Sequence, residues 1–137
     1  MIGSIEAFDL NQITPEQNLY IPKRFFRKME SVAFPKGGVV PLYPKSAKLS
    51  ENAIQSRGGN GYDVSLSWQV RGDKWEDIEV LDMLKNSHKC FKITAFGGNE
   101  AYILSDAEHY QFDYQRSGEM IDCSLKVYNI NGIQQML

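Results

Sequence analysis

Four side chains in the second half of the chain are typical metal ligands: His88, Cys90, His109 and Cys123. Imidazole and thiolate groups bind zinc in tetrahedral sites, where two ligands usually lie a few residues apart, as in C-x2-C or H-x3-H. Neither spacing occurs here, and the alternating pattern around Cys123 places that side chain in a core. The sequence therefore predicts no metal ion or other cofactor, and it predicts that both cysteines are buried and reduced.

A run of acidic side chains is the second group that could act chemically: Asp73, Glu76, Asp77, Glu79 and Asp82. Hydrolases hold two carboxylates at a defined separation in different environments. Here Asp73 and Glu76 instead have the spacing of a helix capping box, and the others are expected on a solvated helix face. Because no G-x-S-x-G or P-loop pattern occurs either, the sequence predicts a protein that is not an enzyme.

A basic and aromatic segment, IPKRFFRKMES, covers residues 21–31. Single-stranded nucleic acids bind to surfaces of this kind, because bases stack on aromatic rings and cations neutralise phosphates. The alternative is an edge segment whose phenylalanines pack on the core while its charges face water. The net charge of -2 favours this alternative, because it gives no general attraction to phosphate backbones. The candidate nucleic-acid patch consists of Lys23, Arg24, Phe25, Arg27 and Lys28.

The segment PKGGVVPLYPKSAK at residues 35–48 is rich in proline and glycine. Proline cannot donate a hydrogen bond to a sheet ladder, so this segment is predicted to be a long loop or arm. Its PLYP sequence at 41–44 also matches the P-x-x-P pattern of polyproline ligands. Apolar residues in such an arm suit a contact with another copy of the protein or with a neighbour in an assembly. The candidate interface residues are Val39, Val40, Leu42 and Tyr43.

Alternating apolar residues predict three pairs of strands connected by short turns. The clearest strand is YDVSLSWQVR at 62–71, in which every second residue is apolar. It is expected to pair with 49–56 across the turn RGGNG. The other predicted pairs join 90–96 to 100–105 and 109–115 to 120–130. In the last pair, the apolar faces of the two strands are expected to meet across a core.

One helix is predicted between these groups of strands, at about residues 74–87. Gly72 ends the preceding strand, and Ile78, Leu81 and Leu84 then recur at the helical period. The 137 residues suffice for one core, so residues 1–137 are predicted to form a single domain. The predicted fold is α+β with mostly antiparallel strands, a sandwich or partly closed barrel whose helix covers one opening or face.

The composition excludes other classes of protein. Acidic and basic residues are nearly balanced, at 17 and 15, as in ordinary globular proteins. No window approaches the ~20 apolar residues of a membrane helix, and the first residues lack a signal-peptide pattern. The sequence therefore predicts no membrane contact and a cytoplasmic location in the cell that makes the protein.

The predicted layout combines a long early loop, an antiparallel sandwich, one inserted helix, and a last strand YNI followed by NGIQQML. Over about residues 49–130 this layout resembles the small tail-tube and tail-associated structural proteins of tailed bacteriophages and their prophage and secretion-tube relatives. The resemblance implies subunits that stack or form rings, in a virion if the protein derives from a phage. It implies contacts through sheet edges and the proline-rich loop, and it assigns no site residues.

Two functional hypotheses follow. The leading one is a non-enzymatic structural protein that forms homo-oligomers or binds neighbouring virion proteins. The alternative is a small barrel-like binding module for single-stranded nucleic acid or a small ligand, with Tyr110, Phe112 and Tyr114 lining a groove. Nucleic acid is the weaker part of this alternative, because the later strands carry no basic stripe.

Overall fold

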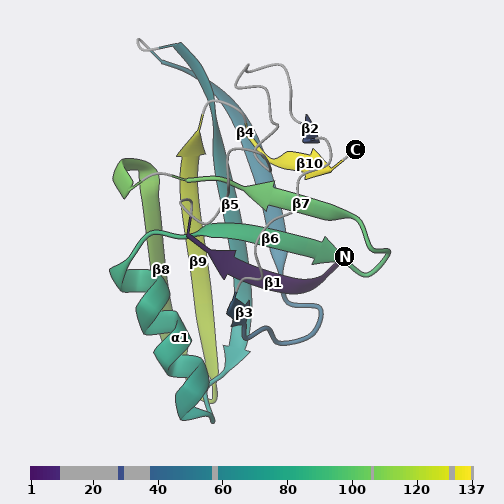
Figure 1. The fold of residues 1–137 in the computed structure, drawn as a ribbon. Helices are drawn as coiled ribbons and strands as arrows, with labels where there is room; N and C mark the ends of the chain where they lie inside the picture. The colour runs from purple at the N-terminus through teal and green to yellow at the C-terminus, as the bar shows by residue number, and fades with distance from the viewer. Residues whose placement is uncertain (10–27, 30–37, 57–58, 106, 130–131, 137) are drawn as a thin grey trace.

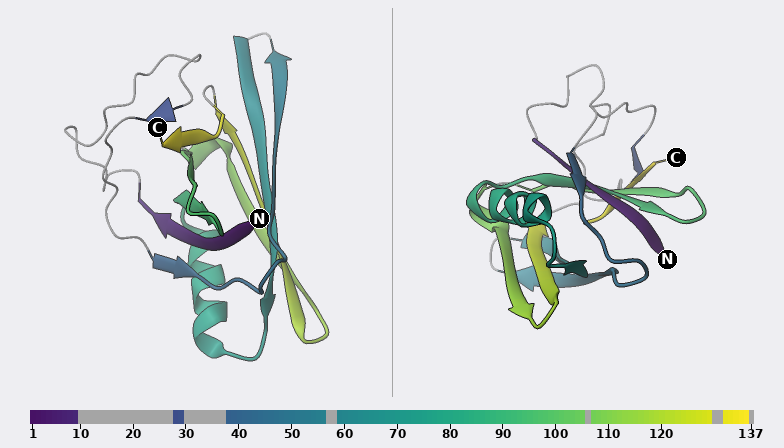
Figure 2. Two further views of the ribbon diagram at one scale, coloured as in Figure 1. Left: turned by 90° about the vertical axis from the view of Figure 1, so that its right-hand side faces the viewer. Right: turned by 90° about the horizontal axis from the view of Figure 1, so that it is seen from below.

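The chain folds into two packed sheets and one helix in the computed structural model, which describes residues 1–9, 28–29, 38–56, 59–105, 107–129 and 132–136 (Figure 1). The first sheet has the strand order β2-β10-β7-β6-β1-β3, and the second has the order β4-β5-β9-β8. The sheets lie face to face as a sandwich, and neither closes into a barrel within these residues (Figure 2). The predicted sandwich of mostly antiparallel strands is therefore confirmed.

Every strand pair in the two sheets is antiparallel except β10 with β2, which is parallel. The first sheet contains β1 (Ile2–Phe8), β2 (Lys28–Met29), β3 (Gly38–Val40), β6 (Cys90–Ala95), β7 (Glu100–Ile103) and β10 (Gln134–Met136). The second contains β4 (Lys48–Ser56), β5 (Gly59–Arg71), β8 (Tyr110–Ser117) and β9 (Met120–Asn129), and the helix α1 spans Trp75–Asn86.

The second sheet consists of two hairpins whose inner strands, β5 and β9, pair with each other. These hairpins and the β6–β7 hairpin confirm all three predicted strand pairs. The predicted turn at 57–61 is wrong for its last three residues, because β5 already begins at Gly59. Between β8 and β9, Gly118 adopts a φ of 66°, which a glycine accepts without steric cost.

Alternation along the strands places one face of each sheet in the core. In the second sheet, Trp68 of β5 stacks on Phe112 of β8, with ring centroids 5.6 Å apart. The register sets Phe112 directly beside Leu125 on the same face of the sheet, so the prediction that the β8 and β9 faces meet across a core is wrong. The first sheet forms the opposite wall of the core, with buried Ile5, Ala7, Phe91, Ile93 and Ile103.

The helix α1 closes one side of the sandwich, next to the edge strand β8 (Figure 1). Leu81 and Leu84 are fully buried, and Ile78 packs against the same core. The hydroxyl of Tyr110 donates a hydrogen bond of 2.7 Å to the backbone oxygen of Leu84, which ties the last turn of the helix to β8. The predicted helix and its apolar face are confirmed.

The predicted capping box at the start of α1 is wrong. The helix begins one residue later than that pattern requires: Lys74 is the N-cap, in an extended conformation, and no side chain caps the helix. The end of β5 explains this shift, because the Gly72 N–H donates to the Glu119 oxygen at 2.9 Å and extends the pairing with the neighbouring hairpin. Asp73 therefore lies in the connection between strand and helix.

The segment at 38–48 is fixed against the sandwich. Residues 38–40 and 48 lie in strands, which corrects the prediction of a loop or arm at 35–48 for these residues, whereas residues 41–47 form a connection outside helices and strands. Residues 38–40 form β3 and pair with β1. The Pro41 oxygen then accepts a hydrogen bond of 3.1 Å from the Trp68 indole, and the Tyr43 N–H donates to the Gln69 oxygen at 2.8 Å. Residues 38–40 can pair as a strand because they contain no proline; Pro41 comes directly after β3.

Candidate functional site

The second sheet turns a polar face to solvent, on the side opposite the core. Along β5 and β9, polar residues alternate with buried apolar ones, as a half-buried sheet requires. The register aligns the outward residues of neighbouring strands in rows. One row contains Asn52, Asp63 and Tyr128, and the next contains Ser65, Lys126 and Gln111.

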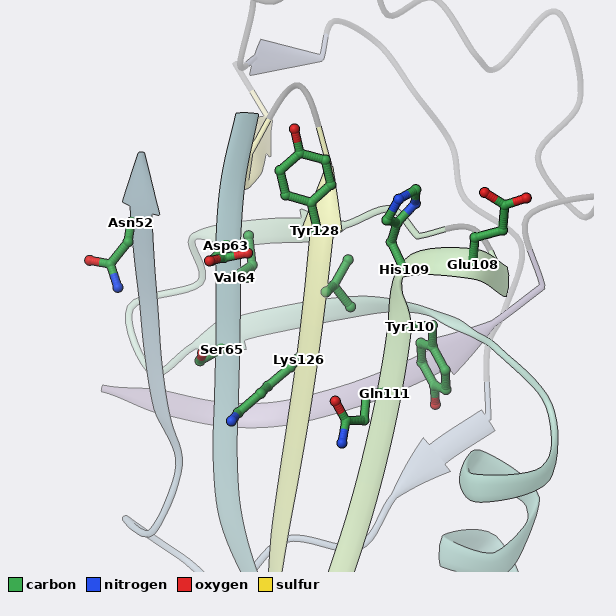
Figure 3. Close-up of a pocket in the computed structure, with 11 residues that line it drawn as sticks. Asn52, Asp63, Val64, Ser65, Glu108, His109, Tyr110, Gln111, Lys126 and Tyr128 are labelled. Carbon is green, nitrogen blue, oxygen red and sulfur yellow. The ribbon is translucent and has the colours of Figure 1, made fainter. Parts of the chain in front are cut away.

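A groove of about 650 Å³ crosses this face near the end of β9 and is open to solvent. We call it the polar groove. Figure 3 shows that side chains from β4, β5, β8 and β9 line it, together with Glu108 and His109 from the 3-10 turn Ala107–His109 that precedes β8. The side chains that define the polar groove are Asn52, Asp63, Ser65, Glu108, His109, Gln111, Lys126 and Tyr128.

Two aromatic rings lie together at one end of the polar groove. The rings of His109 and Tyr128 are tilted by 52°, with centroids 5.3 Å apart. The hydroxyl end of the Tyr128 ring also lies so close to Gly61 that a Cβ atom at this position would collide with it. Glycine within a strand often marks such a close approach. The Tyr128 ring is thus held between a glycine on β5 and a histidine beside β8.

The polar groove offers hydrogen-bonding groups of both kinds and almost no net charge. Asp63 and Glu108 carry carboxylates and Lys126 carries an ammonium group. Within the described part of the chain, the side chains of Asn52, Asp63, Ser65 and Lys126 form no hydrogen bond or ion pair. These groups are therefore available to a bound molecule.

A second hollow, of about 700 Å³, continues along the same face of the sheet. It lies between the connection after β3 and the edge strand β8, and Gln69 donates a hydrogen bond of 2.9 Å to Asp122 across its floor. The outward side chains around it are again mostly polar. They include Lys48, Ser67, Asp113, Gln115 and Ser124.

The four side chains that were considered as metal ligands, and for which the sequence predicts no metal ion, do not come together. Cys90 and Cys123 are both buried, unbridged and in different sheets. Burial raises the pKa of Cys90 and raises that of Cys123 to about 12, so both thiols are protonated near neutral pH. His88 lies beside Tyr110, and His109 beside Tyr128. No group of three His, Cys, Asp or Glu side chains among the described residues could hold a metal ion.

The candidate interface residues of 38–48 divide into two pairs. Val39 and Tyr43 are 72% and 42% exposed, so a partner can reach them. Val40 is buried, and Leu42 packs against the core. The prediction is therefore wrong for Val40, because the pairing of β3 with β1 turns its side chain inward beside Ile5.

The candidate nucleic-acid patch stays a prediction. Lys23, Arg24, Phe25 and Arg27 lie outside the described residues, and of Lys28 only the backbone, in β2, is described. The predicted groove lined by Tyr110, Phe112 and Tyr114 is not formed. Their rings lie on the inner face of the second sheet, where Phe112 is buried and the two tyrosine hydroxyls bond to α1.

The polar groove itself was not predicted from the sequence. Most of its residues lie at the polar positions of alternating strands, and that alternation by itself marks no site. Two signals could have drawn attention to it. Tyr128 is an aromatic residue at an outward position of β9, and Gly61 occupies a position inside β5 where a side chain would be expected.

Within the ranges that the structure describes, no helix is both long and apolar enough to cross a membrane. The chain was also compared with family models, with curated proteins and with solved structures. None of the three comparisons found a match.

Proposed function

We propose that the protein is a non-enzymatic structural protein that assembles through its sheet edges, with copies of itself or with neighbouring virion proteins. The observation that carries this proposal is the hairpin β4–β5, which projects beyond the rest of the sandwich (Figure 2). β9 pairs with β5 only as far as Tyr62, so no third strand among the described residues pairs with the end of the hairpin. A hairpin of two strands is only marginally stable in water, and a partner would stabilise it.

The outer edge of β4 supplies the groups for such a contact. The Gly72 N–H donates to the Glu119 oxygen, so Gly72 directs its backbone toward the β8–β9 hairpin. In an antiparallel ladder this direction alternates from one residue to the next. Every second residue of β5 therefore directs its backbone groups toward β9, and the residues between them direct theirs toward β4. The β4 residues opposite these bond to β5. The residues of β4 between them, including Leu49, Ala53 and Gln55, direct their N–H and C=O groups away from the sheet. No strand in the described ranges pairs with this edge. Unpaired edges of this kind are templates for a strand of another chain.

An exposed apolar pair elsewhere also favours assembly. Phe96 is 64% exposed and Met1 is 71% exposed, and the two are adjacent because the Phe96 N–H donates to the Met1 oxygen at 2.9 Å. Large apolar side chains that lie together on a surface form contacts with other proteins more often than isolated ones do. The pair lies at the free end of the β6–β7 hairpin.

The β4 edge can be tested by a proline at a position whose N–H points outward. Ala53→Pro removes one outward donor and leaves the ladder between β4 and β5 intact. In sedimentation velocity over a wide concentration range, we expect the unaltered chain to form oligomers and Ala53→Pro to raise the dissociation constant at least about tenfold, the equivalent of ~1.4 kcal/mol. Ala53→Ser keeps the N–H and should behave as the unaltered chain. A chain that remains monomeric at every concentration would refute the proposal.

The phage origin is a separate part of the proposal. It is supported by the sandwich with one inserted helix, which is the arrangement that the resemblance to phage tail proteins implies. Genes beside this one that encode capsid, tail-sheath or baseplate proteins would support it. Neighbours that all encode metabolic enzymes would count against a virion component while leaving self-assembly to the sedimentation experiment.

A further inference from the structure

The polar groove lies on a face of the second sheet, whereas the proposed assembly uses sheet edges. Its aromatic pair, its unbonded polar side chains and its open shape are not needed for strand pairing. We propose that the polar groove binds a carbohydrate chain.

Charge separates a carbohydrate from other ligands. A nucleic acid or another phosphate ligand would need a surplus of cations, but the groove has two carboxylates, Asp63 and Glu108, for one ammonium group, Lys126. An apolar ligand would need mainly apolar walls, and the outward side chains here are polar. A neutral, polar ligand is the one that this lining suits.

Hydrogen bonding points to hydroxyl groups. A hydroxyl group both donates and accepts, so it can use a surface on which donors and acceptors are mixed. Asp63 accepts, Lys126 donates, and the amide of Asn52 and the hydroxyl of Ser65 do both. The register places these four side chains on three adjacent strands, so several hydroxyl groups of one molecule can be bonded together.

The ring of Tyr128 provides the stacking surface. The C–H face of a sugar ring packs on an aromatic face through apolar and weak C–H contacts. Figure 3 shows the Tyr128 ring nearly face-on above β9, next to His109. Because Gly61 and His109 hold the ring in place, little side-chain freedom is lost when a ligand binds.

The length of the face indicates a chain of several sugars. The second hollow extends the same polar surface from Lys126 toward Asp122, which lies four residues nearer the start of β9. At ~3.4 Å per residue this adds about 14 Å to the surface. A single sugar would fill only part of it.

The test is a titration of the labelled protein, followed by amide NMR signals, with maltohexaose, cellohexaose and chitohexaose. At least one is expected to shift the signals of Asp63, Lys126 and Tyr128, and glucose to bind more weakly. Asp63→Asn and Tyr128→Leu should each weaken binding about tenfold, whereas Glu79→Gln on the helix should not. The Ala53→Pro variant should still bind, which separates this proposal from that of assembly.

Three results would overturn the proposal. The first is the absence of shifts around the groove with all three hexasaccharides at millimolar concentration. The second is unchanged binding by both Asp63→Asn and Tyr128→Leu. The third is a shift of the same signals by an oligothymidylate, which would assign the groove to nucleic acid. Asp63 is exposed and asparagine has nearly the same shape, so the Asp63→Asn variant should stay folded. It therefore keeps the test valid even if Tyr128→Leu unfolds.

Discussion

The two sides of the second sheet differ in how they are completed. Beside β8, the helix α1 fills the space between the sheets, with Leu81 and Leu84 fully buried and Tyr110 bonded to the helix backbone. Beside β4, no described strand covers the edge, and the hairpin extends past the body of the sandwich. One side is stabilised by apolar contacts within the chain, and the other presents backbone groups that the proposed assembly would pair.

The largest expected effect is on the side that α1 closes. Leu84→Ala leaves a cavity under the helix and is expected to lower the free energy of unfolding by about 2–5 kcal/mol. Urea unfolding followed by circular dichroism measures this change. Met83→Ala, at the neighbouring exposed position, is the control and should change stability by less than about 0.5 kcal/mol. Equal effects of the two substitutions would mean that α1 does not contribute to the core.

Alkaline pH should weaken the same region. The pKa of the Cys123 thiol, which lies beside Tyr114, is raised from 9.0 to about 12 by burial. The unfolded chain therefore loses this proton at lower pH than the folded chain does. The contribution of the protonated Cys123 thiol to the free energy of unfolding is complete below pH 9. Between pH 9 and about pH 12 the free energy of unfolding should fall by up to about 1.4 kcal/mol per pH unit because of this group.

The matched variant for this pH dependence is Cys123→Val, which removes the thiol and keeps an apolar side chain of similar size. Its unfolding free energy should decline less steeply above pH 9 than that of the unaltered chain. Some decline remains, because burial also raises the pKa of Cys90 and of Tyr110. An equally steep decline in the variant would show that Cys123 does not cause it.

The smallest of these effects concerns a single hydrogen bond between β8 and α1. Tyr110→Phe removes the bond to the Leu84 oxygen and should cost about 0.5–1.5 kcal/mol of stability. Hydrogen exchange of the amides in the last turn of α1 should accelerate, while exchange in β4 should not change. Faster exchange in both regions would mean that the two sides are not independent.

Local patterns in the sequence predicted most of the fold. The strand at 62–71 and the helix face of Ile78, Leu81 and Leu84 depend on residues that repeat at a fixed period, and these elements are confirmed. The capping box failed because a partner distant in sequence decides where β5 ends: Glu119 binds the Gly72 N–H, and the helix begins later. The spacing of Asp73 and Glu76 carries no information about that partner.

The sites were harder to predict, because they depend on which strands are neighbours. Tyr110, Phe112 and Tyr114 share one face of a strand, as predicted, but only the fold shows that α1 covers this face. Val40 was assigned to an interface because the prolines around it indicated a loop, and pairing with β1 buries it instead. The polar groove combines four strands from both halves of the chain, so no single segment contains it.

The pairing of β5 with β9 has a consequence for how the chain folds during synthesis. Tyr62 pairs with Asn129, so the central ladder of the second sheet joins residues that are far apart in sequence. Contacts of this kind slow folding, because a long loop must close before they form. While β9 is still inside the ribosome, β5 has only β4 beside it, and its row of apolar side chains is uncovered. The protein therefore depends on late residues to protect an early strand from aggregation.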